Sequence, residues 1–118
     1  MIDRPDAARL LNAMAETLSD EILPATRGGA QHAVRVVANL CRILEREVRA
    51  GPEPAERTVQ ALEELLGRKG DLASLVAALD RRLQQDEAGD ADFEARAYAV
   101  ILEDVRRRLA IDRPGYEP

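Results

Sequence analysis

The sequence predicts an all-α protein: an antiparallel bundle of about five helices, folded as one domain over residues 1–118. Apolar residues recur at steps of three and four along most of the chain, which is the spacing that gathers side chains on one side of a helix. No segment shows the alternation of β-branched residues that is typical of a strand. The connectors between the helical patterns are short, and short connectors favour antiparallel neighbours.

The longest helical pattern covers residues 30–50, which read AQHAVRVVANLCRILEREVRA. Its apolar positions span roughly half of the helix circumference at about 100° per residue. We expect a helix with so broad an apolar arc to lie between other helices, so the pattern predicts that residues 30–50 form the centre of the bundle. These apolar positions are Ala30, Val34, Val36, Val37, Leu40, Cys41, Ile43, Leu44 and Val48.

The first helix is predicted over about residues 7–23, after a lead-in of residues 1–5. Asp6 is its expected cap, and Pro24 ends it because a proline ring lacks an N–H and clashes with the preceding turn. Its expected buried stripe is Leu10, Leu11, Met14, Leu18 and Ile22.

Two helices with narrow apolar stripes follow the central one. Pro52 and Pro54 open the third helix, Gly67 and Gly70 bracket its link to the fourth, and Asp71 is the expected cap of the fourth. The expected stripe of the third is Ala55, Val59, Leu62 and Leu66 with Leu65 at its edge, and that of the fourth is Leu72, Leu75, Val76, Leu79 and Leu83.

The fifth helix follows a polar, glycine-containing loop over residues 84–92, with Asp90 or Asp92 as its cap. Its expected core stripe is Tyr98, Ile101, Leu102, Val105 and Leu109. Phe93, Val100 and Ile111 lie on a different side, and a second apolar edge indicates an interface. The alternative is that Phe93 and Ile111 pack under loops of the same chain.

Charge and hydrophobicity argue against nucleic-acid binding and against membrane association. The formal net charge is −5, whereas nucleic-acid binding needs a basic surface. No apolar run approaches the roughly 20 residues that span a bilayer, so we expect no membrane association. With one cysteine and no export signal at the N-terminus, the expected compartment is the cytoplasm.

The sequence contains no recognisable catalytic or metal-binding set. A lone His32 and a lone Cys41 cannot form a zinc site, and they lie on different sides of the central helix. Cys41 falls within the apolar arc, where a thiol normally serves as packing. We therefore predict no catalytic residues, no metal and no cofactor, and we expect no enzyme activity from the chain acting alone.

A polar stripe on the central helix is the candidate binding site. Arg35, Asn39, Arg42 and Arg46 follow one line at helical spacing, and guanidinium groups favour carboxylates or phosphates. The alternative is a solvated face whose arginines pair with glutamates of neighbouring helices, such as Glu63 and Glu64.

Glu47 is a further candidate, because its position falls within the apolar arc of the same helix. An unpaired buried carboxylate is costly, so we expect Glu47 either to reach solvent or to pair with an arginine of the first or fifth helix. Such a pair would be structural or would mark a functional pocket.

Several segments resemble a bacterial domain family of unknown function. The specific part is residues 35–40 (RVVANL) followed by Arg46-Glu47-Val48. Residues 109–116 (LAIDRPGY) and the opening Arg4-Pro5, with Leu10-Leu11 and Pro24 downstream, are also similar to that family. The chain has Arg113 where the family tends to have asparagine before its terminal proline, so no role is transferred to that position.

The resemblance implies a small cytoplasmic protein encoded beside aminoglycoside-phosphotransferase-like kinases and acyl-CoA dehydrogenases. It implies an accessory protein in acyl-CoA-related metabolism that binds such a kinase or associates with itself. The chain is not itself a kinase, since it lacks the glycine-rich loop and the metal-binding Asp motif. The alternative is a module that binds a small anion such as an acyl-CoA or a nucleotide through Arg35, Asn39, Arg42 and Arg46. An enzyme acting alone is a third possibility and would require a deep cleft around Asn39 and Glu47.

Overall fold

A computed structural model describes residues 6–85 and 89–116 and forms five α-helices, with no strand among these residues. The all-α prediction is therefore confirmed. The lead-in over residues 1–5 and the centre of the predicted polar loop, residues 86–88, lie outside the described residues. The helices are α1 (Ala7–Thr17), α2 (Gly28–Ala50), α3 (Glu53–Leu66), α4 (Leu72–Gln85) and α5 (Ala91–Asp112).

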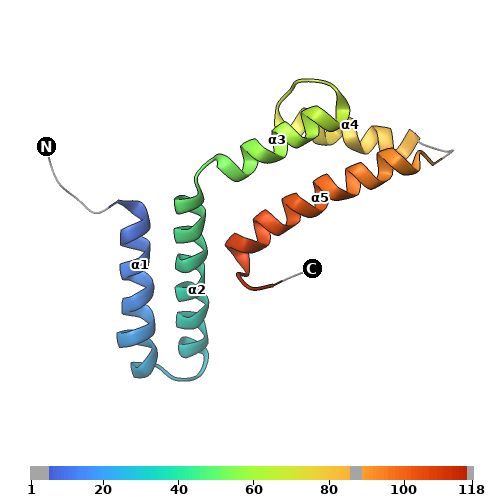
Figure 1. Cartoon of the computed structure of the whole chain (residues 1–118). Coiled ribbons are helices and arrows are strands. Elements are labelled where there is room, and N and C mark those ends of the chain that lie inside the picture. The colour runs from blue at the N-terminus through green and yellow to red at the C-terminus, as the bar shows by residue number, and fades with distance from the viewer. Residues whose placement is uncertain (1–5, 86–88, 117–118) are drawn as a thin grey trace, which may run out of the picture. The chain divides into compact units, whose positions relative to one another are not determined.

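The helices form two compact units, Met1–Gly51 and Pro52–Pro118. The first unit is a hairpin of α1 and α2, and the second contains α3, α4 and α5 (Figure 1). The prediction of a single domain centred on α2 concerns both units together, and it stays a prediction.

Small residues form the contact between α1 and α2, which run antiparallel (Figure 1). Ala8 and Ala15 of α1 and Ala38 and Cys41 of α2 are all buried, as expected for Cys41. Small side chains let two helices approach closely along their line of contact.

The predicted buried stripe of the first helix is wrong at three of its five positions. Leu10, Met14 and Ile22 are 49%, 52% and 40% exposed, and Leu11 and Leu18 are half-buried. Because a second helix covers only one line of α1, the alanines occupy that line and the longer side chains flank it.

The end of the first helix differs from a regular α-helix. A π-helical turn, Leu18–Ile22, follows α1 and leads into a 3-10 turn, Leu23–Ala25. The backbone N–H of Leu23 donates to the carbonyl oxygen of Leu18, five residues back. Pro24 explains the change, because its ring cannot fit the regular spacing against the carbonyl four residues before it.

The connector to α2 is held by side-chain hydrogen bonds. The Thr26 hydroxyl donates to the carbonyl oxygen of Leu23 at 3.0 Å. The Gln31 side-chain amide donates to the carbonyl oxygens of Leu23 at 3.3 Å and Thr26 at 3.1 Å. Gly28, with φ +62°, takes the left-handed conformation that glycine adopts most easily at the start of α2.

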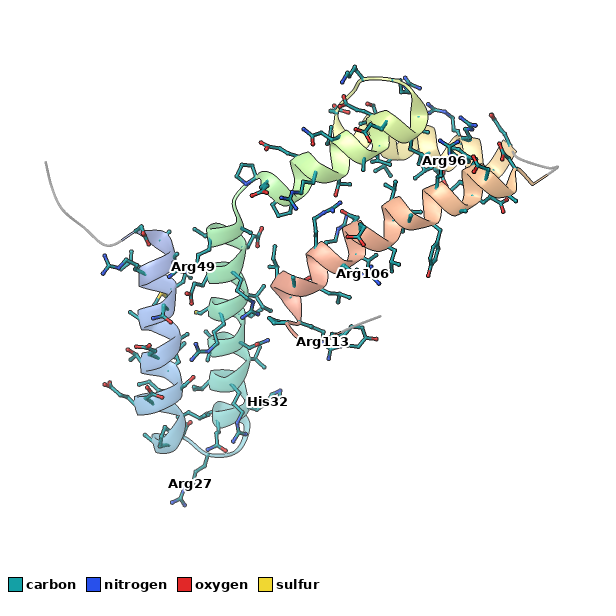
Figure 2. The ribbon with its side chains drawn as sticks, viewed as in Figure 1. Arg27, His32, Arg49, Arg96, Arg106 and Arg113 are labelled. Carbon is teal, nitrogen blue, oxygen red and sulfur yellow. The ribbon has the colours of Figure 1, made fainter. Side chains whose placement is uncertain are left out.

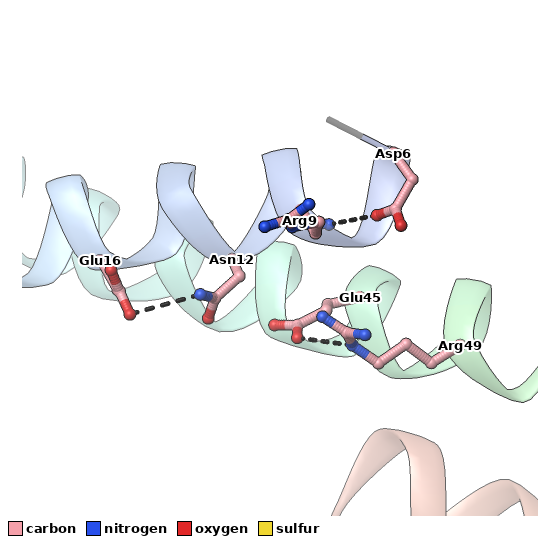
Figure 3. Close-up of polar contacts among 6 residues, drawn as sticks. All are labelled: Asp6, Arg9, Asn12, Glu16, Glu45 and Arg49. Carbon is pink, nitrogen blue, oxygen red and sulfur yellow. Dashed lines mark hydrogen bonds and ion pairs between the residues drawn. The ribbon is translucent and has the colours of Figure 1, made fainter. Parts of the chain in front are cut away.

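Local hydrogen bonds support both helices of the hairpin (Figure 3). The Asp6 carboxylate caps α1 by accepting from the backbone N–H of Arg9 at 2.8 Å, which confirms the predicted cap. Asn12 donates to Glu16 at 3.3 Å, and Arg49 pairs with Glu45 at 2.9 Å, each pair one helical turn apart. Exposed pairs of this kind contribute only a few tenths of a kcal/mol each, so they adjust the helices rather than hold the hairpin together.

The second unit has a core of larger side chains, because α3 packs against both α4 and α5. The predicted stripes of α3 and α4 contribute as expected through Leu62, Leu65, Leu75 and Leu79, although Val76 and Leu83 are 50% and 37% exposed. The full core cluster is Leu62, Leu65, Leu75, Leu79, Phe93 and Ala97.

The predicted core stripe of the fifth helix is wrong. The structure buries Phe93 and Ala97 and packs Val100 against the core, whereas Tyr98 and Ile101 are 66% and 44% exposed. Two polar residues, Asp104 and Arg107, continue the core side of α5 toward its C-terminal end, where both contact Thr58 of α3.

Candidate functional site

The structure brings together three of the four residues of the predicted polar stripe. Arg35, Asn39 and Arg42 line a shallow pocket of about 180 Å³ in the hairpin, which Ser19, Leu23, Val34 and Ala38 complete. The pocket lies between the polar side of α2 and the turns that follow α1. Arg35 and Asn39 are exposed at its rim, and Arg42 is half-buried.

Ser19 is a pocket residue that sequence reasoning did not identify. It lies in the π-helical turn, and such turns occur often at functional sites. An i→i+5 turn holds one residue more than an α-helical turn, which changes the direction of the side chains within it. The signal in the sequence was Pro24, which we interpreted only as the end of a helix.

The pocket can receive a small anion. Among the described residues, the side chains of Arg35, Asn39 and Arg42 have no hydrogen-bond or ion-pair partner, so their donors are available to a ligand. Two guanidinium groups, one amide and one hydroxyl form a donor set suited to a phosphate or a carboxylate. No carboxylate of the described residues lines the pocket.

The other two candidates on α2 lie outside this pocket. Arg46, on the same stripe, is half-buried and engaged in an interaction of its own. Glu47 is exposed, so its carboxylate follows the alternative of reaching solvent. The expected pair with an arginine of the first or fifth helix is not found among the described residues. Glu63, suggested as a partner of the stripe, pairs with Lys69 at 3.6 Å.

A second surface of the hairpin is apolar, and we call it the apolar hairpin face. Its members are between 45% and 52% exposed. They are Leu10 and Met14 of α1 and Val37, Leu40, Leu44 and Val48 of α2.

Helix geometry places these six residues on one face. In each helix they lie on the order of 100° around the axis from the buried residues, in the same rotational sense. Because α1 and α2 are antiparallel, equal offsets point to the same side of the hairpin. Arg35, Asn39 and Arg42 are offset in the opposite sense, so the hairpin has an apolar face and a basic face.

The predicted interface candidates of α5 occupy other positions. Phe93 is 1% exposed and lies in the core, with the Arg82 guanidinium 3.8 Å from its ring centroid. Val100 packs against the same core, and Ile111 is half-buried. Phe93 therefore packs among the leucines of α3 and α4, and not under a loop as the alternative expected.

A buried polar cluster links α3 to α5, and sequence reasoning missed it. The Thr58 hydroxyl, 5% exposed as a residue, donates to Asp104 at 2.7 Å and accepts from Arg107 at 3.0 Å. The Nε of Arg107 is buried with no hydrogen-bond partner among the described residues. The partners lie 46 and 49 residues from Thr58 in the sequence, so no local pattern could have indicated the cluster.

A groove of about 300 Å³ adjoins this cluster in the second unit. It is lined by Thr58 and Leu62 of α3 and by residues of α4 and α5. The Arg108 guanidinium at its rim is held by Asp104 at 3.0 Å. Both oxygens of Asp104 are thus engaged, which indicates a structural role for this carboxylate.

Within residues 6–85 and 89–116, no helix combines the length and the apolar character that crossing a bilayer requires. The same residues contain no group of three or more His, Cys, Asp or Glu side chains placed to hold a metal ion.

Fold and site together define an all-α protein of two helical units with a basic pocket on its hairpin. Residues 24–116 match the model of a family described as a domain of unknown function, DUF6285, and the chain belongs to this family. The matched region contains α2 to α5 and Arg35, Asn39 and Arg42, whereas Ser19 and α1 precede it. Neither the curated proteins nor the solved structures that were compared gave a match.

Proposed function

We propose that this protein is a non-catalytic, cytoplasmic interaction protein that binds a phosphotransferase-like kinase of acyl-CoA-related metabolism. The observation that carries the proposal is the apolar hairpin face, where six large apolar side chains are about half exposed. Such a face, formed by two helices and bordered by charged residues, has the composition of a protein-binding surface.

The size of this face supports a protein partner. Six half-exposed apolar residues present on the order of 500 Å², at the upper end of the largest patch on a typical monomer. The basic face on the other side of α2 has a different chemistry, so one helix separates two surfaces.

The identity of the partner comes from the family resemblance. Residues 35–40 and Arg46-Glu47-Val48 resemble a family encoded beside aminoglycoside-phosphotransferase-like kinases and acyl-CoA dehydrogenases, and proteins encoded together often act together.

Co-expression with the neighbouring phosphotransferase, followed by affinity capture, tests the proposal. We expect the two proteins to co-elute, and we expect Leu44→Glu on the apolar hairpin face to abolish co-elution. Tyr98→Glu is the matched control, because it places the same charge at an exposed apolar position of α5. If the wild-type proteins fail to co-elute, a kinase is not the partner. If both variants capture the kinase equally, the apolar hairpin face is not the surface that binds it.

A second candidate function is the binding of a small anion, and the pocket lined by Arg35, Asn39 and Arg42 specifically favours it. Its donors suit the phosphate groups of a nucleotide or of an acyl-CoA. A thermal-shift series with CoA esters, nucleotides and inorganic phosphate tests this function. A ligand present at about 100 times its dissociation constant stabilises the protein by roughly 2.7 kcal/mol.

The control for this series lies on the same helix. We expect Arg42→Ala to remove the ligand-induced shift, whereas Arg49→Ala should retain it because Arg49 pairs with Glu45 outside the pocket. No shift with any of these compounds, or an equal shift in both variants, would contradict anion binding at this site.

A further inference from the structure

We infer that the groove of the second unit binds an aliphatic monocarboxylate, with the carboxylate of the ligand at Arg108 and its hydrocarbon chain beside α4. Every residue that lines the groove belongs to α3, α4 or α5. The site is therefore separate from the apolar hairpin face and from the basic pocket, and the inference goes beyond the proposed function.

The groove exists because α4 and α5 each pack against α3, whereas close approaches between α4 and α5 are few. Six aliphatic side chains of these two helices line it, and three of them, Val76, Leu83 and Ile101, are between 37% and 50% exposed. No aromatic side chain of the described residues lines the groove, so it offers no surface for stacking on a ring and suits a flexible hydrocarbon chain. The six are Leu72, Val76, Leu79 and Leu83 of α4 and Val100 and Ile101 of α5.

The volume of the groove, about 300 Å³, limits what can enter it. Pockets for small molecules begin near this size. At about 30 Å³ for a group of the size of a water molecule or a methylene, the groove holds roughly ten such groups. The stripe from Leu72 to Leu83 is about 16 Å long, and a helix of that length, roughly 10–12 Å across with its side chains, has several times this volume. The groove therefore admits a chain and not a helix of a protein partner.

The end of the groove at Arg108 is basic. Arg108 pairs with Asp104 through its Nε at 3.0 Å, and Arg107 joins the same cluster through the hydroxyl of Thr58. One carboxylate of this cluster therefore faces two guanidinium groups, so positive charge is in excess. A guanidinium carries five N–H donors, and the ion pair at Nε leaves other donors of Arg108 for the carboxylate of a ligand.

The other end of the groove is acidic, because Asp80 lies there. Asp80 is two residues before Arg82, whose guanidinium contacts Phe93 near the start of α5. Arg108 is 15 residues beyond Phe93, about 22 Å along the helix. The Asp80 carboxylate accepts from the side-chain amide of Gln84 at 3.3 Å. A carboxylate ligand is thus attracted to one end and repelled from the other, which fixes the direction of its chain.

Titration of the full chain with sodium decanoate, below the concentration at which it forms micelles, is the first test. We expect saturable chemical-shift changes at the amides of residues 72–83 and 100–108. Ile101→Glu should weaken binding by at least about tenfold, because it places a charge in the apolar lining. Tyr98→Glu, three residues earlier on α5 and outside the groove, is the matched control. Circular dichroism should show that both variants retain their helices.

The contact with the carboxylate is tested by Arg108→Gln. We expect decanoate to bind about threefold to tenfold more weakly, as for the loss of one partly exposed charge-assisted contact. Uncharged decanol should bind as it does to the wild type, which also shows that the groove survives the loss of the pair with Asp104. Arg106→Gln is the matched control, because Arg106 pairs with Glu103 at 2.8 Å on the same helix and does not line the groove (Figure 2).

The length of the ligand tests the volume of the groove. From hexanoate to decanoate, each added methylene should raise the affinity by about twofold to fourfold. Beyond about ten or eleven carbons the gain should end, because the groove is then full.

Several results would overturn the inference. They are the absence of saturable shifts with decanoate, shifts confined to residues 7–50, equal binding to Ile101→Glu and Tyr98→Glu, an affinity that does not rise with chain length, and an equal loss of decanoate and decanol binding in Arg108→Gln. If decanoate does not bind and Ile101→Glu instead abolishes capture of the phosphotransferase, the groove is a protein-binding surface and the inference is wrong. The proposed function is judged separately, by capture that depends on Leu44.

Discussion

The two units of this protein bury side chains of different size between their helices. In the hairpin, the buried apolar residues are small: Ala8, Ala15, Ala38 and Cys41. In the three-helix unit, the core contains four leucines and Phe93. Two helices meet along one line and bury one stripe each, whereas a third helix closes a volume that large side chains can fill.

The comparison teaches that helix number, and not hydrophobicity, decides which residues are buried. Residues 30–50 form the broader apolar arc, yet Leu40, Leu44 and Val48 are about half exposed. The narrow stripes of α3 and α4 supply fully buried leucines, because each helix has a neighbour on the correct side. A broad apolar arc therefore indicates how much contact a helix can make, and the number of its neighbours sets how much of that contact is made within the unit.

Removing the aromatic centre of the three-helix unit should have the largest effect. Phe93→Ala empties the position of a side chain that is 1% exposed and also removes its contact with Arg82. We expect a loss of about 3–5 kcal/mol in the free energy of unfolding, measured by urea denaturation. Tyr98→Ala is the matched control on the same helix and should cost less than about 1 kcal/mol, because Tyr98 is 66% exposed. Equal losses would show that the core assignment of α5 is wrong.

The close approach of α1 and α2 can be broken by adding volume. Ala15 is 0% exposed, so Ala15→Leu forces the two helices apart and should cost about 1–3 kcal/mol. Ala13→Leu, two residues away at an exposed position, should change stability by less than about 0.5 kcal/mol. Amide hydrogen exchange reads each helix separately, and it should show lost protection in α1 and α2 with α3 unaffected.

The polar link between α3 and α5 sharpens the comparison, because the hairpin has no equivalent among its described residues. Thr58→Val keeps the shape of the side chain but leaves Asp104 and Arg107 each without one hydrogen bond. We expect a loss of about 1–2 kcal/mol, observed as a lower urea midpoint. The exposed Thr17→Val provides the control, and a stability equal to that of the wild type would show that the cluster is dispensable.

The smallest effect concerns the start of α4. The Asp71 carboxylate accepts from the backbone N–H of Ser74 at 2.8 Å, and this bond, together with the Ser74 side chain, lowers the pKa of Asp71 below its ordinary value of 3.8. A lowered pKa in the folded state means that the stabilisation is present above the unfolded value and is lost as the pH falls through the folded value.

This effect is measured by comparing the Tm of the wild type and of Asp71→Ala at neutral pH and at low pH. Because the pKa of Asp71 is lowered, Asp71→Ala should lower Tm near neutral pH, and its difference from the wild type should shrink well below pH 3.8. A difference that does not depend on pH would show that the carboxylate charge plays no part in the cap.

The sequence was sufficient to locate the helices, but it could not show which side of each helix packs against a neighbour. Periodicity located five helices, and capping chemistry identified Asp6 and Asp71, each of which accepts from a backbone N–H three residues on. For the fifth helix it left Asp90 and Asp92 as alternatives, and Asp90 is the residue that accepts from the backbone N–H of Phe93. On α5 the same reasoning chose the wrong side, because it counted apolar residues and so ignored Ala97 and the polar pair that faces Thr58.

The candidate site shows the same limit. The line of Arg35, Asn39 and Arg42 follows from helical spacing alone, and these residues do share a pocket. Ser19 and Leu23 could not be assigned to it, because their approach depends on how the chain turns at Pro24. Local spacing predicts what one helix presents, and only the fold shows which segment lies opposite.

The π-helical turn at Leu18–Ile22 contains one residue more than a regular helix would need over the same rise. Deleting a single residue there would restore an ordinary helix and rotate everything that precedes it by about 100° relative to α2. The alanines of α1 would then leave the line of contact, and Ser19 would leave the pocket. One extra amino acid thus couples the register of the hairpin to the wall of its basic pocket, so a length variant at this position tests both at once.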